Sequence, residues 1–135
     1  MVNGKMGNAM TGIFEIHVKT DFSAAHCLRE YDGDCERLHG HNWTVEVFVR
    51  CRKLNNIGIG IDFREVKKAI GEVVKPLDHS HLNEHPAFRN ENPTSENIAQ
   101  YIYEKLADKL NSQEVKVSKV KISETQGAGV YYWEE

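Results

Sequence analysis

Apolar and polar residues alternate in four segments of the chain, which is the pattern of β-strands with one buried face. These segments are residues 13–19, 43–50, 115–122 and 129–133. In the third segment the apolar positions change parity between Val117 and Val120, which predicts a β-bulge. The Asn and Gly residues of 54–60 predict a turn into a further short strand that ends near Ile61.

Between the second and third strands, the spacing of apolar residues changes to that of amphipathic helices. The two helical segments are residues 62–75 and 95–110. Asp62 and Glu65 fit a capping box at the start of the first helix, and Pro76 limits its far end. Thr94 or Ser95 is the expected N-cap of the second helix.

The order of these elements is two strands, two helices and two strands. It predicts an α+β fold with a four-stranded, mostly antiparallel sheet and both helices on one face. We expect residues 13–135 to form a single domain, preceded by a flexible tail of residues 1–12. An open sheet of this kind leaves two edges, which makes association through those edges plausible.

Composition narrows the possible functions of this domain. The chain has 135 residues, of which 40% are hydrophobic and 27% charged, with a net charge of −3. This charge gives no support to general binding of nucleic acid or of anionic membranes. No apolar run approaches the roughly 20 residues of a membrane span. The three cysteines are odd in number and lack framework spacing, so we expect reduced thiols in a cytoplasmic protein.

The segment "CERLHGHN", residues 35–42, concentrates the reactive side chains. If the second strand begins at His39, then His39 and His41 lie on the same face and can bind one metal ion. His26 ends a run of small and apolar residues, and it is the best candidate for a third ligand. A second H-x-H pair, His79 and His81, competes with the first, and spacing alone does not choose between them.

Several motifs together resemble the 6-pyruvoyltetrahydropterin synthase family. They are "FSAAH", "CERLHGHN", "LDHSHLN", "NPTSEN" and "SET", in the order and approximate spacing of that family. The resemblance covers residues 13–134, and "IDFREVK" and "NPTSEN" are most similar to the 6-carboxytetrahydropterin synthases of queuosine biosynthesis. It implies the tunnelling fold (T-fold), in which subunits associate into hexamers of two stacked trimers with active sites shared between subunits.

The resemblance also implies roles for individual residues. Zn²⁺ would be bound by His26, His39 and His41. The catalytic residues would be Cys35, Asp78, His79 and Glu124. Glu124 would also anchor the pterin, and Thr94 and Ser95 would contact the pterin ring. Under this interpretation His81 has a structural role, or it contacts site residues without binding the metal or the substrate itself.

The implied reaction converts 7,8-dihydroneopterin triphosphate to 6-carboxy-5,6,7,8-tetrahydropterin, with loss of triphosphate and acetaldehyde. This is lyase chemistry on a small-molecule pterin. Formation of 6-pyruvoyltetrahydropterin is one alternative. Another arises because Glu36 stands three residues before His39, which resembles the E-x-x-H-G-H pattern of a folate-branch group that forms 6-hydroxymethyl-7,8-dihydropterin. Glu36 is therefore a further catalytic candidate.

Two hypotheses outside this family remain open from the sequence. A non-catalytic zinc-binding module would use the histidines but give Cys35 no role. A small cupin-like metal enzyme also combines H-x-H with a remote histidine and an acid. That fold needs many more strands, and the two helical segments count against it.

Overall fold

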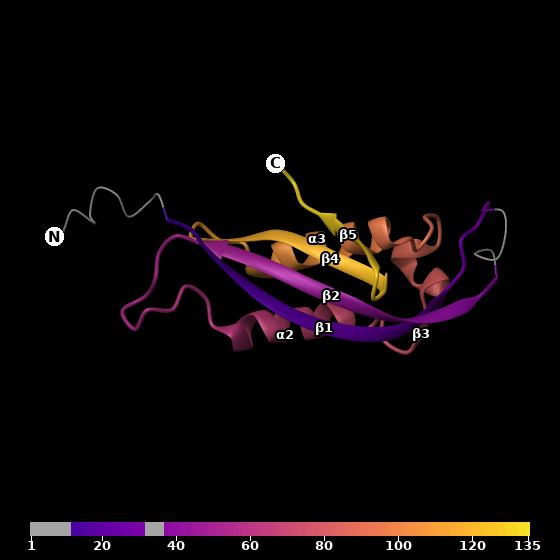
Figure 1. Ribbon diagram of the computed structural model, residues 1–135, viewed down its shortest axis with the longest axis horizontal. Helices are drawn as coiled ribbons and strands as arrows, with labels where there is room; N and C mark the ends of the chain where they lie inside the picture. Colours follow the sequence, from indigo (N-terminus) through magenta and orange to yellow (C-terminus); the bar gives the residue numbers. More distant parts are fainter. Residues whose placement is uncertain (1–11, 32–36) are drawn as a thin grey trace.

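The structure is a computed structural model that describes residues 12–31 and 37–135. The predicted tail, apart from Gly12, lies outside the described residues. The elements in chain order are β1 (Phe14–His26), β2 (His39–Cys51), α2 (Phe63–Val74), β3 (Ser80–His81), two 3₁₀ turns (Leu82–Glu84 and Pro86–Phe88), α3 (Ser95–Leu110), β4 (Val115–Thr125) and β5 (Ala128–Tyr132). The predicted α+β class is confirmed (Figure 1).

The sheet contains five strands within the described residues, in the order β3-β1-β2-β4-β5. The prediction of four strands was therefore wrong by one. The additional strand, β3, has only two residues and pairs parallel with Ala24 and Ala25 of β1. Such a short strand has no periodicity of its own, and it forms because the neighbouring edge of β1 is available.

β1 and β2 form the long central ribbon of the sheet. They pair antiparallel without interruption from Phe14 opposite Cys51 to His26 opposite His39. Both strands have 13 residues and extend beyond the predicted limits, so the first one reaches His26. This register places the end of β1 and the start of β2 side by side at one end of the sheet (Figure 1).

Helices α2 and α3 pack on one face of the sheet, as predicted, and close a single hydrophobic core. The face of β2 turned towards them is fully buried at Trp43, Val45, Val47 and Val49. Asp62 caps α2, but its side chain accepts the N–H of Arg64 rather than completing the expected capping box through Glu65.

The bulge that the sequence predicts in the first C-terminal strand is present in β4. Phe48 lies opposite Lys119 and Val49 opposite Val117, so Ser118 is the additional residue of a bulge in β4. The parity change in the sequence is thereby confirmed. By contrast, no strand ends near Ile61, because the Asn55 side chain accepts the N–H groups of Ile57 and Ile59 and holds this segment in a turn.

Thr94, and not Ser95, provides the cap of α3, since its hydroxyl accepts the N–H of Asn97 at 3.1 Å. We expect Thr94→Ala to lower the free energy of unfolding by about 1 kcal/mol, because one N–H of the first helical turn loses its acceptor. Ser95→Ala is the matched control and should change it by clearly less. Urea denaturation of the two variants measures the difference, and equal effects would contradict the assignment.

Candidate metal centre and active site

Three histidines from the two central strands meet at one end of the sheet. His26 is the last residue of β1 and lies directly opposite His39, the first residue of β2. His41 follows two residues later on the same face of β2. One ring nitrogen from each of the three residues lies within 4.8 Å of the others. The predicted H-x-H pair and the remote third histidine are therefore brought together.

Backbone carbonyls fix the tautomers of two of these rings. Nδ1 of His26 lies 2.8 Å from the carbonyl oxygen of Pro93, and Nδ1 of His39 lies 2.7 Å from that of Arg37. A carbonyl oxygen only accepts hydrogen bonds, so each Nδ1 carries the hydrogen and each neutral ring has a bare Nε2. The two Nε2 atoms are only 3.0 Å apart. Two lone pairs at this distance repel each other unless a cation lies between them.

The surroundings of the group favour a metal ion over a proton as that cation. His26 is 1% exposed, and its burial lowers its pKa, so the ring resists protonation. Nε2 of His41 is buried and has no hydrogen-bond partner within the described residues. Such an atom is expected to have a ligand that protein atoms do not supply. Three imidazoles, two of them oriented by backbone carbonyls, fit a divalent transition metal with an open coordination position.

The indole ring of Trp43 packs against two of the three histidines. Its ring centroid lies 4.9 Å from that of His26 and 5.3 Å from that of His41. The indole is fully buried, and its Nε1 donates to the carbonyl of Ala24 at 3.2 Å. The imidazoles therefore rest against a side chain that cannot easily move.

Glu124, near the end of β4, brings a carboxylate to the same place. Its oxygens lie 3.6 Å from Nε2 of His26 and 3.8 Å from Nε2 of His41. These distances are longer than hydrogen bonds, and Glu124 lies outside the three-histidine group. The side chain is one-third exposed, so it can face both the centre and a ligand that enters from solvent.

Asp78 and His79 form a second reactive pair beside the histidines. The carboxylate of Asp78 accepts the N–H of Ser23 at 2.9 Å and lies 3.0 Å from Nδ1 of His79. The Ser23 N–H is the main cause that lowers the pKa of Asp78, with a smaller effect from His79. His79 has a left-handed backbone, with φ of 57°, while its ring is mostly exposed. Backbone strain of this kind is common in functional sites, and the contact with Asp78 holds one side of the His79 ring.

A pocket of about 370 Å³ lies beside His79 and is also lined by Ser23, Asn42 and His41. The structure thus places six of the predicted site residues in two adjacent groups. Thr94 and Ser95 lie directly after Pro93, whose carbonyl orients His26, so the start of α3 borders the centre. Cys35 and Glu36 lie outside the described residues.

The competing histidine pair does not form a metal group. His79 pairs with Asp78, whereas Nδ1 of His81 lies 3.4 Å from the Glu84 carboxylate. The two side chains thus have different partners, although they are two residues apart in sequence.

Two asparagines that the sequence did not single out anchor the segment after His26. Asn83 binds the N–H and carbonyl of Cys27, and Asn92 binds those of Arg29. The Arg29 guanidinium in turn donates to three carbonyls, those of Asn83, Phe88 and Glu91. These contacts position the chain that leads towards Cys35. The only signal in the sequence was the clustering of Asn in 83–92, which also suits a plain loop.

The fold and site together define an α+β protein with a three-histidine group that could hold a metal ion and an acid–histidine pair near the same end of β1. The family model described as 6-pyruvoyl tetrahydropterin synthase matches residues 15–135. The chain belongs to this family. The family acts on pterin substrates, and the chain is a lyase-type enzyme. This membership excludes the non-catalytic zinc module, and the five strands and two α-helices of the described residues exclude the cupin alternative.

Individual relatives support the same family. A 6-carboxy-5,6,7,8-tetrahydropterin synthase of Synechocystis is 38% identical over 69% of this chain and 74% of its own. A dihydroneopterin monophosphate aldolase of Pyrococcus furiosus is 36% identical over 83% of this chain and 90% of its own. The solved 6-pyruvoyl tetrahydropterin synthase of Caenorhabditis elegans is 28% identical, with a TM-score of 0.83 over 92% of this chain and 97% of that chain. The tunnelling fold is thereby confirmed.

No helix in the described part of the chain is long and apolar enough to cross a membrane.

Proposed function

We propose that this enzyme converts 7,8-dihydroneopterin triphosphate to 6-carboxy-5,6,7,8-tetrahydropterin, releasing triphosphate and acetaldehyde, as a step of queuosine synthesis. The observation that carries the proposal is the pair of bare Nε2 atoms of His26 and His39, 3.0 Å apart, with the unpartnered Nε2 of His41 beside them. We propose Zn²⁺ as the cation that they bind with His41, because three imidazoles and an open position are typical of catalytic zinc. Relatives named for the carboxypterin product support the choice of reaction.

When bound, zinc would supply a Lewis acid that stabilises negative charge on the side-chain oxygens of the substrate. The residues of the chain have separate tasks. Glu124 accepts parallel N–H bonds from the cyclic amidine of the pterin, as a carboxylate does from arginine. The pterin ring would also contact Thr94 and Ser95. Cys35 as a thiolate removes a proton from a side-chain carbon, and His79 moves protons with Asp78 orienting its ring.

We also propose that the enzyme assembles into a homohexamer in the cytoplasm, with active sites between subunits. The free edges of the sheet support this. β3 covers β1 only at Ala24 and Ala25, and the outer edge of β5 has no strand partner in the described residues. Exposed Tyr31 and Leu38 stand on either side of the segment that contains Cys35. A neighbouring subunit would cover such edges and apolar side chains.

Incubation of the zinc-loaded enzyme with 7,8-dihydroneopterin triphosphate, followed by mass spectrometry of the products, tests the proposed reaction. We expect 6-carboxytetrahydropterin together with acetaldehyde and triphosphate. A pterin with a three-carbon pyruvoyl side chain, or no conversion at all, would overturn it.

A second activity, formation of 6-hydroxymethyl-7,8-dihydropterin, is favoured by the similarity to the aldolase of P. furiosus. Such a reaction also cleaves a carbon–carbon bond in the side chain. Cys35 and Glu36 are adjacent, and a thiolate and a carboxylate one residue apart present different bases to different carbons. We therefore propose Cys35 for the carboxypterin reaction and Glu36 for the second one.

Single variants separate these two roles. Cys35→Ala should abolish carboxypterin formation and spare some hydroxymethylpterin, and Glu36→Ala should do the reverse. Both products are measured in one assay by chromatography, with metal content as a control for the integrity of the site. If Glu36→Ala changes neither product, the second activity is wrong and Cys35 alone is the base.

A further inference from the structure

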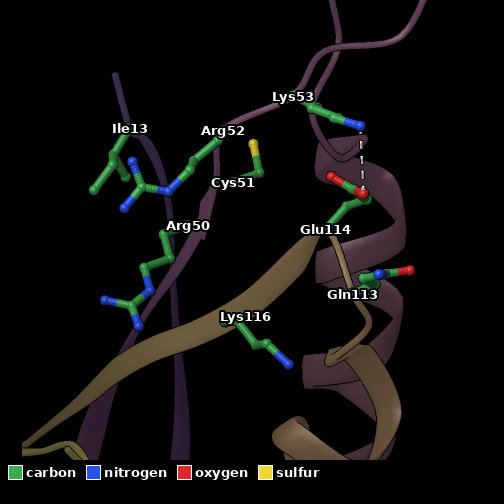
Figure 2. Close-up of a pocket in the computed structure, with 8 residues that line it drawn as sticks. All are labelled: Ile13, Arg50, Cys51, Arg52, Lys53, Gln113, Glu114 and Lys116. Atoms are coloured by element: carbon green, nitrogen blue, oxygen red, sulfur yellow. Dashed lines mark ion pairs between the residues drawn. The ribbon is translucent and has the colours of Figure 1, made fainter. Parts of the chain in front are cut away.

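A basic pocket lies at the end of the sheet opposite to the metal centre. It has a volume of about 400 Å³ and is formed where β2 ends and β4 begins (Figure 2). The residues that line it are Ile13, Arg50, Cys51, Arg52, Lys53, Gln113, Glu114 and Lys116. Four of these side chains are cationic and one is acidic, in a chain whose net charge is −3.

Two of the cations belong to residues that lie opposite each other on neighbouring strands. Arg50 of β2 and Lys116 of β4 are partners in the strand register, where like charges destabilise a sheet. No carboxylate of the described residues lies within 4.0 Å of either side chain. The pair therefore lacks a counter-ion from the protein, and an anion in the pocket would offset the repulsion.

The nearby acids are engaged elsewhere. Glu15 lies opposite Arg50 on the other side of β2, but its carboxylate accepts from Ser118 at 2.8 Å and lies 3.8 Å from Lys119. Glu114 lies 3.8 Å from the Lys53 amine. Figure 2 shows this ion pair on the side of the pocket away from the Arg50 and Arg52 guanidinium groups. None of these acids thus neutralises the pair formed by Arg50 and Lys116.

We propose that this pocket binds an oligophosphate, either inorganic triphosphate or the phosphate chain of a nucleotide. One guanidinium group can bind two oxygens of a phosphate through two parallel N–H bonds, and lysine contributes a further positive charge. The volume suits a small molecule and not a nucleic-acid strand. Cations on the end of β2, the segment after it and the start of β4 are spread out, which favours an extended, multiply charged anion over a single phosphate.

The pocket is separate from the metal centre of its own chain. β2 has 13 residues, so at about 3.3 Å per residue its two ends lie roughly 40 Å apart. One substrate molecule cannot contact both sites of a single chain. The proposal does not depend on the proposed reaction, because the ligand is recognised by charge alone and binding is measured without turnover.

Titration calorimetry of the full chain with sodium triphosphate at low ionic strength tests the proposal. The double variant Arg50→Gln/Lys116→Gln should weaken binding at least tenfold. Lys67→Gln/Lys68→Gln, which removes the same charge from exposed positions of α2, should stay within twofold of the unmodified protein. Wild-type affinity in the first double variant would overturn the proposal.

Folding is checked by thermal denaturation without ligand, where loss of the like-charged pair should leave the midpoint unchanged or raise it. If the double variant does not fold, Lys116→Glu alone, at an exposed position, should show the same loss of binding.

Further arms identify the source of the anion. Orthophosphate should bind at least tenfold more weakly than triphosphate, and equal affinities would overturn the assignment to a phosphate chain. If adenosine triphosphate and inorganic triphosphate bind with equal affinity, the site recognises the phosphate chain alone. If adenosine triphosphate binds more tightly, the site recognises a nucleotide. Both results support the proposal. Triphosphate should still bind to His39→Ala, and loss of binding there would place the anion at the metal centre and contradict it.

Discussion

His41→Ala should remove most of the bound metal and essentially all activity. Nε2 of His41 is buried and has no hydrogen-bond partner among the described residues, so we expect it to bind the metal. Loss of a residue that only supports a ligand reduces metal affinity by roughly 10–100-fold, and loss of a ligand itself should exceed this. His39→Ala should behave in the same way. Elemental analysis of the purified proteins gives the metal content per chain.

His81→Ala is the matched control, because His81 belongs to the second H-x-H pair but binds Glu84 and not the histidine group. It should keep its metal. The assignment fails if His39→Ala and His41→Ala both retain full occupancy, and metal lost from His81→Ala alone would move the site to the second pair.

Glu124→Gln should weaken substrate binding by about 2–5 kcal/mol while the metal stays in place. The change leaves the shape of the side chain but removes the charge that would pair with the pterin amidine. Binding of a non-reactive pterin analogue, measured by calorimetry on the metal-loaded protein, gives the difference directly. Glu114→Gln, an exposed acid at the far end of the sheet, is the control and should bind normally.

Metal analysis of Glu124→Gln separates two possible actions of this carboxylate. Its oxygens lie 3.6 and 3.8 Å from ring nitrogens of His26 and His41, which is close enough to influence the centre. Substantial loss of metal would show that Glu124 acts through the metal and not through the pterin. An unchanged binding constant would place it outside the substrate site.

The sequence predicted those parts of the fold that follow from local period. Alternation identified the strands, the spacing of apolar residues identified both helices, and the parity change before Val120 located the bulge. It also placed His39 and His41 on one face, because alternate residues of a strand point the same way. The turn predicted in 54–60 forms, but the short strand expected to end near Ile61 does not, because the Asn55 side chain holds the N–H groups of Ile57 and Ile59.

Long-range contacts were decided only by the tertiary structure. The carbonyl that orients His26 belongs to Pro93, 67 residues away, and the N–H that orients Asp78 belongs to Ser23, 55 residues away. β3 exists only because β1 offers an edge at Ala24 and Ala25. The basic pocket likewise depends on Arg50 and Lys116 meeting across two strands. The local sequence pattern determines which face of the sheet a side chain occupies. The register between distant segments determines which group that side chain contacts. These contacts set the tautomers, charges and orientations on which the chemistry depends.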